Sequence, residues 1–371
     1  MFKNYRIRDY DFKLIIMLIA VSVLGVMTIG SAREIYKEKQ MMGLVLGIIV
    51  MLVLSFLDYS YILNFYWVLY VINIALLALV QFMGDTSGGA QRWLDLGFMR
   101  FQPSETAKII LILFYAQFIM KHRENINSVR TIITMLLLLC PPLLLIYKQP
   151  DLSTSIMIIL IFCSIWFIGG LSSKIILGVL AVAIPSAVIF LMLVLQPNQN
   201  LIQGYQQTRI LAWLNPEKYS SGEAYQQNNA IMAIGSGQLW GKGLNNNVIS
   251  SVKNGNFISE PHTDFIFTVV GEELGFVGAC GIVILLFLIT LECIIVAKKA
   301  KDLAGTCIAT GMAALVGFQS FINIAVSTGL LPNTGIPLPF LSYGLTSLLS
   351  LYIGMGFVLN VRLQCIRKYN N

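Results

Sequence analysis

Long apolar runs, separated by short polar or basic stretches, dominate the chain. A helix needs about 20 mostly apolar residues to cross a bilayer. Ten runs approach that length, at approximately residues 13–32, 41–57, 61–83, 104–120, 130–147, 152–170, 174–195, 264–297, 304–328 and 342–361. The pattern therefore predicts an all-α polytopic membrane protein with ten transmembrane helices and a single membrane domain over residues 1–371.

Composition and charge support this prediction and suggest an orientation. Of the 371 residues, 57% are hydrophobic and 12% are charged, whereas a soluble domain carries about 25% charged residues. The net charge of +7 comes from short basic clusters between the apolar runs, which is typical of cytoplasmic loops and argues against nucleic-acid binding. All clusters fall on one side of the membrane when the number of spans is even. We therefore expect both termini in the cytoplasm.

This topology places three longer segments on the outer side, at residues 84–103, 196–262 and 329–341. Loops of such length are usually functional or disordered. The second is predicted to be a large extracytoplasmic loop between the seventh and eighth spans. It contains an apolar piece, NNAIMAIGSGQLWGKGL at residues 228–244, which favours a folded cap.

The segment EPHTDFIFTVVGEELGFVG at residues 260–278 places carboxylates where the eighth span begins. An ionisable residue at bilayer depth costs roughly 2.5–3.5 kcal/mol on insertion scales, so it is a candidate functional residue. Asp264 follows a helix entry formed by Pro261, His262 and Thr263, and a carboxylate there could accept a proton from a sugar hydroxyl. Glu272 and Glu273 lie deeper, and we expect one of them to be a buried, paired structural acid.

A second group of charges lies in QRWLDLGFMRFQPSETAK at residues 91–108. Ser104 is a predicted N-cap, and Glu105 and Lys108 share one helical face, where they can pair. Such a pair could merely neutralise two charges that enter the membrane. Alternatively, these residues form the wall of a polar cavity in which Arg92, Arg100 and Lys108 face an anionic ligand, since arginine can donate two bonds to phosphate oxygens.

A third group is KQPDLSTS at residues 148–155. Asp151 follows Pro150 at the start of the sixth span. It could serve only as an N-cap, or it could also contribute a carboxylate to the same outer region. The sequence leaves both interpretations open.

Several of these motifs together resemble the SEDS family of shape, elongation, division and sporulation proteins, which includes RodA, FtsW and SpoVE. The resemblance runs from RWLDLGFMRFQPSE through QPDLSTS, YQQTRILAWLNPE and HTDFIFTVVGEELG to NTGIPLPFLSYGLTS at residues 333–347, which contains Ser342. Two positions depart from the family signature: Leu345 stands where a second glycine is usual, and Asn333 follows Pro332. Within the family, the chain looks most like RodA.

The resemblance implies a peptidoglycan glycosyltransferase of the bacterial cytoplasmic membrane. Such an enzyme polymerises lipid II into β-1,4-linked glycan strands on the outer face and releases undecaprenyl pyrophosphate, for cell-wall elongation and cell shape. The family's essential aspartate falls on Asp264, which we expect to be the general base. Its required basic and acidic residues fall on Arg100, Glu105 and Lys108. The residues that we expect to bind substrate or pyrophosphate are Arg100, Lys108, Glu105, Arg92, Asp151, His262 and Ser342.

The resemblance also implies partners. Lipid II and membrane lipid are the expected ligands, and a class B penicillin-binding protein is the expected protein partner for cross-linking. A divalent cation, Mg or Mn, could help to stabilise the leaving group, although the chain contains no ligand cluster that requires one. Two alternatives come from other classes: a flippase that moves lipid II across the membrane, and a scaffold of a division or elongation complex. A division or sporulation paralogue with the same chemistry is a third alternative.

Overall fold

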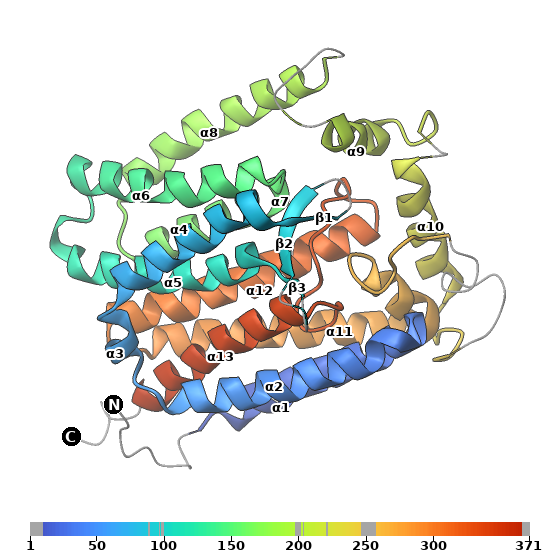
Figure 1. Cartoon of the computed structure of the whole chain (residues 1–371), viewed down its shortest axis with the longest axis horizontal. Coiled ribbons are helices and arrows are strands. Elements are labelled where there is room, and N and C mark those ends of the chain that lie inside the picture. Colours follow the sequence, from blue (N-terminus) through green and yellow to red (C-terminus); the bar gives the residue numbers. More distant parts are fainter. Residues whose placement is uncertain are drawn as a thin grey trace.

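Figure 1 shows the computed structural model as a bundle of helices that run along the long axis of the molecule. The structure describes residues 10–365 except 88–89, 96, 98–99, 197–201, 203, 220–221 and 246–256. Every predicted run falls on a helix. These helices are α1 (Phe12–Ala32), α2 (Lys37–Phe56), α4 (Tyr66–Met83), α5 (Pro103–Lys121), α6 (Val129–Lys148), α7 (Leu152–Ile168), α8 (Ser173–Val194), α11 (Ile266–Lys298), α12 (Leu303–Ser327) and α13 (Leu345–Cys365).

Among the described residues, seven helices are long and apolar enough to cross a membrane. They are α1, α2 together with the short η2 (Glu34–Tyr36), α4, α6, α11, α12 and α13, whereas α7 is apolar but shorter. The count of ten spans therefore stays a prediction. The run predicted at 61–83 is interrupted, because the short α3 (Tyr59–Leu63) ends before α4 begins.

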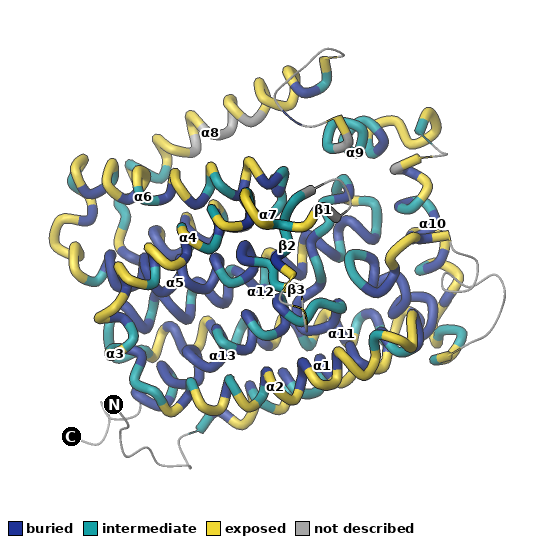
Figure 2. The backbone as a smooth tube through the Cα atoms, viewed as in Figure 1, coloured by how far each residue is buried: buried dark blue, intermediate teal, exposed yellow. Residues whose placement is uncertain are grey.

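The core of the bundle lies around α5, α12 and α13, whose tubes are mostly dark blue in Figure 2. Helix α5 packs against α4, α7, α12 and α13 and is buried along almost its whole length. This position explains how α5 can carry Glu105 and Lys108: both charges face protein and not lipid. The outer helices instead expose apolar side chains, as expected for a surface in contact with hydrocarbon.

One end of the bundle carries the additional structure, and we call it the capped end. A small antiparallel sheet in the order β1-β2-β3 connects α4 to α5 there, from strands β1 (Asp85–Ser87), β2 (Ala90–Asp95) and β3 (Arg100–Phe101). This sheet was not predicted from the sequence. The segment predicted as a large extracytoplasmic loop contains two helices, α9 (Gly204–Leu214) and α10 (Glu223–Ser236), which is in keeping with a folded cap, while its location outside the membrane stays a prediction. Both described chain ends lie at the opposite end of the bundle (Figure 1).

The cap is fixed to the bundle by a break in α11. Gly275 has a φ of 67°, a region that favours glycine, and it interrupts the helical hydrogen bonds. The turn after α10 replaces them: Lys242 N donates to the Glu272 carbonyl at 3.0 Å, and Phe276 N donates to the Gln238 carbonyl at 2.8 Å. The backbone N–H and carbonyl groups that the break leaves without helical partners are thereby hydrogen-bonded by the cap.

The two glutamates beside this break are buried and paired, as expected for structural acids. The Glu272 carboxylate accepts a bond from Lys242 Nζ at 2.8 Å. The Glu273 carboxylate accepts a bond from the Ser31 hydroxyl of α1. Both residues therefore hold the cap and α1 against α11, and neither lines the cavities described below.

Candidate functional site

Two adjoining cavities lie at the capped end. The first, of about 260 Å³, is bordered by β2, α5, α7, α9 and the loops that precede α11 and α13, and we call it the inner chamber. Five of the residues predicted from the sequence line it, namely Arg92, Glu105, Lys108, Asp151 and Asp264. The second, of about 520 Å³, is the outer chamber, which is lined among others by Tyr36, Lys39, Arg100, His262 and Tyr343. The wall between them is shared by Trp93, Glu260, Thr263, Tyr343 and Gly344.

Asp264 lies two residues before α11 and is held through its backbone. Asn323 of α12 donates from Nδ2 to the Asp264 carbonyl and to the Ile336 carbonyl, each at 2.7 Å. The carboxylate borders Gly335: a Cβ at that glycine would lie 3.4 Å from Asp264 Oδ2 and 3.7 Å from Arg209 Nη1. Three distant segments thus meet at this carboxylate.

The surroundings of Asp264 alter its acidity. Burial raises the pKa of Asp264 to about 6, because removal from water disfavours the charged form. The Arg209 guanidinium lowers this pKa and the Glu260 carboxylate raises it. Arg92 also lowers the pKa and Asp151 also raises it, both by smaller amounts. Part of the side chain still faces the chamber. A carboxylate with a pKa near 6 is mostly ionised at neutral pH and is a stronger base than an ordinary aspartate.

The predicted ion pair of α5 is confirmed. Lys108 Nζ lies 2.7 Å from Glu105 Oε1, and it also donates to Gln319 Oε1 at 3.1 Å. Both charged side chains are almost fully buried. The predicted N-cap was wrong by two residues, because the helix starts at Pro103 and Gln102 occupies the cap position. Proline has no N–H to satisfy, which makes it well suited to the first helical position.

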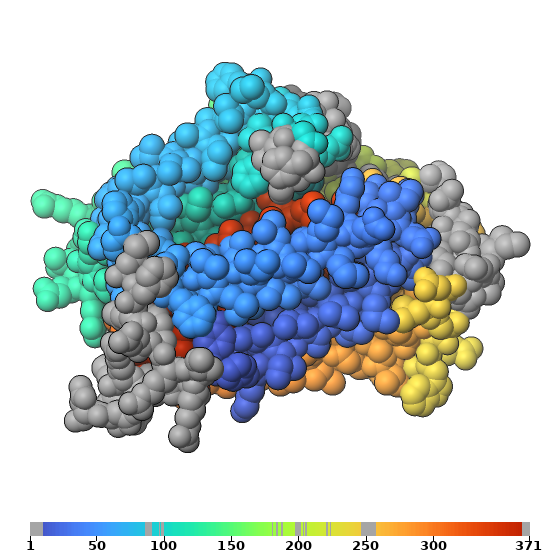
Figure 3. Space-filling view, turned by 60° about the horizontal axis from the view of Figure 1, so that its bottom comes forward, coloured from blue at the N-terminus to red at the C-terminus, as the bar shows by residue number. Residues whose placement is uncertain are grey.

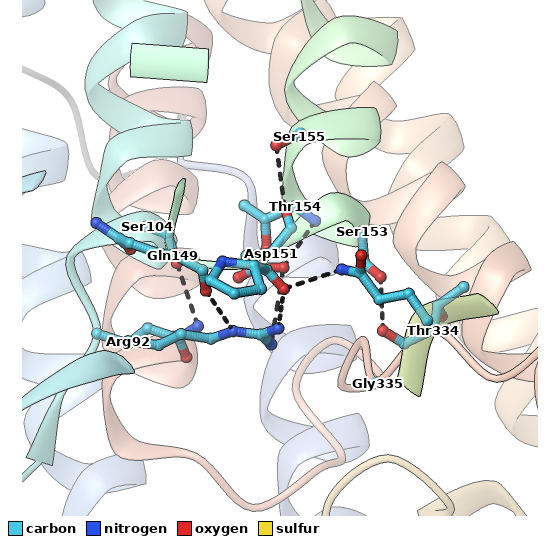
Figure 4. A network of polar contacts seen from close by, with 12 residues as sticks. Arg92, Ser104, Gln149, Asp151, Ser153, Thr154, Ser155, Thr334 and Gly335 are labelled. Atoms are coloured by element: carbon cyan, nitrogen blue, oxygen red, sulfur yellow. Dashed lines mark hydrogen bonds and ion pairs between the residues drawn. The ribbon is translucent and has the colours of Figure 1, made fainter. Parts of the chain in front are cut away.

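Figure 4 shows the second ion pair, between Arg92 and Asp151. Asp151 is the N-cap of α7 and accepts from Thr154 N at 3.1 Å, while Arg92 Nη1 lies 3.9 Å from its Oδ1. The guanidinium also donates to the Gln149 carbonyl at 3.1 Å and to the Pro150 carbonyl. Both interpretations left open by the sequence therefore fit, because Asp151 caps the helix and lines the inner chamber.

Arg100 does not join Arg92 and Lys108 in one wall, which corrects the prediction of a single cationic surface. It lines the outer chamber. The reason is the sheet: β3 pairs back onto β2 with Asp95 opposite Arg100, so the two arginines lie at different ends of one hairpin. The Arg100 carbonyl accepts a bond from Thr346 Oγ1 of α13 at 3.0 Å, which ties β3 to the bundle.

His262 also belongs to the outer chamber. Its ring stacks on Tyr36, with centroids 4.5 Å apart and an angle of 14° between the planes. Burial, and secondly the nearby Arg33, lower the pKa of His262 to about 4. The ring is therefore neutral at neutral pH. It can offer hydrogen bonds and a stacking surface to a ligand, but no positive charge.

Ser342 lines neither chamber, although it was predicted to bind substrate. Its buried hydroxyl donates to the Thr263 carbonyl at 2.6 Å and accepts from Leu338 N at 2.7 Å. Tyr343 N donates to the His262 carbonyl at 2.9 Å. The loop around Ser342 thus holds the backbone beside Asp264, and Ser342 is a positioning residue.

Two cations of the chambers were not predicted from the sequence, Arg209 in the inner chamber and Lys39 in the outer chamber. A signal existed for the first, because Arg209 is the only charged residue between positions 175 and 216. No comparable signal marks Lys39, which lies among Lys37, Glu38 and other charges at the start of α2. Within the described residues, no group of three or more His, Cys, Asp or Glu side chains could hold a metal ion.

Comparison with known proteins agrees with this architecture. The profile of the FtsW, RodA and SpoVE family, described as "Cell cycle protein", matches residues 10–365. The peptidoglycan glycosyltransferase MrdB of Escherichia coli K12 is 35% identical over 354 residues, which cover 95% of this chain and 93% of the relative. A probable peptidoglycan glycosyltransferase FtsW of Geobacter sulfurreducens is 32% identical over 374 residues, covering 96% and 95% of the two chains.

Solved structures show the same fold. A chain of a peptidoglycan synthase complex that couples polymerization and crosslinking superposes with a TM-score of 0.78 at 30% identity, covering 98% of this chain and 99% of that chain. The rod shape determining protein RodA of Thermus thermophilus superposes with a TM-score of 0.69 at 28% identity, covering 98% of both chains. The protein is thus a multi-pass helical membrane protein, and it belongs to the FtsW, RodA and SpoVE family.

Proposed function

We propose that this protein is a peptidoglycan glycosyltransferase that polymerises lipid II into β-1,4-linked glycan strands, with Asp264 as general base. The observation that carries the proposal is the desolvated Asp264 carboxylate, which faces a polar cavity together with the Arg209, Arg92 and Lys108 cations. Relatives from both the MrdB and FtsW branches carry the same activity in their names. The likeness to MrdB and RodA supports a role in cell-wall elongation.

The proposed reaction is a single displacement at the sugar. Asp264 removes the proton from the 4-hydroxyl of the acceptor N-acetylglucosamine, and that oxygen bonds to C1 of the donor N-acetylmuramic acid. The bond from C1 to the pyrophosphate breaks, the configuration at C1 inverts, and undecaprenyl pyrophosphate leaves. Cations near the pyrophosphate stabilise the charge that develops on it.

The orientation follows from the substrate. The capped end faces the outer side of the cytoplasmic membrane and both termini face the cytoplasm, in keeping with the basic clusters of the sequence. The expected protein partner is a class B penicillin-binding protein, since one neighbour comes from a complex that couples polymerization and crosslinking. A flippase is the second candidate, but both chambers lie at one end of the bundle, which suits chemistry on one membrane face better than passage across it.

The test is polymerisation of purified lipid II by the protein in liposomes, with and without its penicillin-binding partner. Wild type should form glycan strands, and Asp264→Asn should be slower by about 100- to 10,000-fold, the usual contribution of a general base. Asp264→Asn must insert normally and unfold at the wild-type temperature for the comparison to count. Strands from this variant at the wild-type rate would disprove the assignment of the base. No strands from wild type with its partner present would favour transport or scaffolding.

A further inference from the structure

Helix α12 carries two buried amide side chains one turn apart, Gln319 and Asn323, and neither lines the inner or the outer chamber. On the face shown in Figure 3, α1, α2 and α4 form much of the surface, and red atoms of α13 are visible between α2 and α4. Helix α12 lies in the interior and packs against α5, α7, α11 and α13. Any part that these amides take in the reaction must therefore pass through the residues that they contact.

The segment at residues 332–337, which precedes α13, depends on these amides for part of its hydrogen bonding. No residue of the segment forms a backbone–backbone hydrogen bond with another described residue. Its Ile336 carbonyl instead accepts from Asn323 Nδ2 at 2.7 Å, and its Pro337 carbonyl accepts from Gln319 Nε2 at 2.9 Å. Since buried carbonyl groups need such partners, α12 sets the path of the segment where it borders the inner chamber.

Gln319 also contacts the ion pair of α5. Lys108 Nζ donates to Gln319 Oε1 at 3.1 Å and to Glu105 Oε1 at 2.7 Å. An ammonium can only donate and a carbonyl can only accept, so only one of the two orientations of the Gln319 amide satisfies both of its neighbours. The Pro337 carbonyl takes an amide N–H, and the amide oxygen is left for Lys108. Gln319 is thereby fixed by the segment on one side and fixes the ammonium on the other.

The direction of the Lys108 ammonium follows from these two bonds. Its Nζ has three N–H donors, of which Glu105 and Gln319 take two. Lys108 forms no third hydrogen bond with a described residue, and its side chain lines the inner chamber. A single bond to Glu105 would leave the ammonium free to turn about that contact. Two bonds determine where the third N–H lies, and this donor is available to a ligand in the chamber.

Asp264 is held by the other amide. Asn323 Nδ2 donates to the Asp264 carbonyl as well as to the Ile336 carbonyl, each at 2.7 Å. Helix α12 thus has one anchor for the carboxylate and a separate one for the cation, and both anchors are attached to neighbouring carbonyls of one segment. A change confined to Gln319 should therefore affect Lys108 and leave Asp264 in place.

We propose that Gln319 is a positioning residue for glycosyl transfer, which fixes the Lys108 ammonium so that its third N–H donates to a substrate oxygen in the inner chamber. The proposal rests on the proposed function and adds a residue that does not itself touch the substrate. While Asp264 takes the proton of the acceptor hydroxyl, the ammonium donates to an oxygen whose negative charge grows in the transition state. A donor that is already oriented stabilises this charge without reorganisation during the reaction.

The test is the steady-state rate of lipid II polymerisation in liposomes, with the penicillin-binding partner present, for wild type and Gln319→Met. Methionine has a similar length and shape but can hold neither neighbour. We expect kcat to fall about 10- to 100-fold, since a shift of about 1 Å in a catalytic group can cost this much, and KM to stay within about twofold. The acid limb of the pH profile should keep its midpoint near pH 6, because Asn323 still holds Asp264.

Two further variants separate positioning from stability. Gln319→Ala leaves room for water, which can bond to Lys108 and to the Pro337 carbonyl without fixing the ammonium, so the protein should fold and kcat should still fall. Gln117→Met makes the same change as Gln319→Met at a buried glutamine of α5 outside both chambers, and its kcat should stay within about twofold of wild type. Thermal unfolding of each variant allows the rates to be compared per folded protein.

A double-variant cycle with Lys108→Arg shows whether Gln319 acts through Lys108. Arginine keeps the positive charge beside Glu105 but places its N–H donors differently. Because both changes disturb the same contact, adding Gln319→Met to Lys108→Arg should lower kcat by no more than about threefold. A full 10- to 100-fold reduction in that background would show that Gln319 acts by another route and would overturn the proposal.

Two other results would also overturn it. One is a kcat within about twofold of wild type in folded Gln319→Met and Gln319→Ala, and the other is a shift of the acid limb, which would mean that Gln319 acts on Asp264. An active wild type beside normal Gln319 variants removes only the role of Gln319. A wild type that forms no glycan strands removes the proposed function, and this proposal with it.

Discussion

The inner and outer chambers share a wall, but their charged groups are organised differently. In the inner chamber, buried cations and carboxylates are largely matched to each other, as in the pair of Glu105 and Lys108. In the outer chamber, Lys39 and Arg100 face solvent without an ion-pair partner among the described residues. The comparison teaches that inner charges are needed for the fold and to set the acidity of Asp264, whereas outer charges are available to a ligand.

The largest expected effect tests the structural side of this comparison. Lys108→Met leaves Glu105 as a buried charge without its cation, and breaking such a pair typically costs about 3–5 kcal/mol. Lys39→Met should leave the stability unchanged, because this side chain is exposed and forms no ion pair with a residue that the structure describes. Thermal unfolding of the purified variants measures both. The double variant Glu105→Gln with Lys108→Met should recover part of the loss, and a Lys108→Met variant as stable as wild type would contradict the assignment.

The second prediction concerns the packing beside the outer chamber. Gly43→Ala places a methyl group against the flexible end of the Leu345 side chain, which must shift, so we expect a cost of at most about 1 kcal/mol, the low end of the usual range for overpacking. Leu345 is also one of the two departures from the family signature. Adding Leu345→Ala should therefore restore stability in the double variant. A double-variant cycle in thermal unfolding checks this, and simple additivity of the two changes would show that the residues do not press on each other.

The third prediction is a pH dependence that arises in the inner chamber. Burial raises the pKa of Asp264 to about 6, so the carboxylate is protonated below this pH and ionised above it. The polymerisation rate should therefore fall as the pH drops, to about one tenth at pH 5 of its value at pH 7–8, where the base is almost fully ionised. Initial rates measured across this range test the prediction. A rate that stays constant down to pH 5 would argue against Asp264 as the base.

The smallest expected effects are shifts of that profile in opposite directions. Arg209 lowers the pKa of Asp264 and Glu260 raises it. Arg209→Gln should therefore move the acid limb of the profile to higher pH, and Glu260→Gln should move it to lower pH. Both groups are partly or fully exposed, so salt should weaken the shifts. Movement of both profiles in the same direction would show that the two residues do not act on Asp264 through their charge.

Much of this protein could be predicted from the order of its residues. Apolar runs of membrane length predicted the helices, because hydrocarbon requires every backbone group to be bonded within a helix. Asp264, Glu105 and Lys108 stood out as charged residues within those runs, because a charge at bilayer depth is costly and is usually kept for a structural or functional role. The ion pair of α5 followed from a spacing of three residues, and the cap of α7 followed from Asp151 after a proline.

Only the tertiary structure decided which of these residues meet. Arg100 and Arg92 are neighbours in the chain, yet strand pairing places them in different chambers. Arg209 and Asp264 come from distant segments and meet in the inner chamber, and no local pattern of the sequence relates them. The break of α11 at Gly275 is a further example. The backbone groups that it frees are hydrogen-bonded by the turn after α10, which lies more than 30 residues earlier in the sequence. Local spacing and hydrophobicity act within a segment, whereas the pairing of buried charges and the pKa of Asp264 depend on what the fold brings around them.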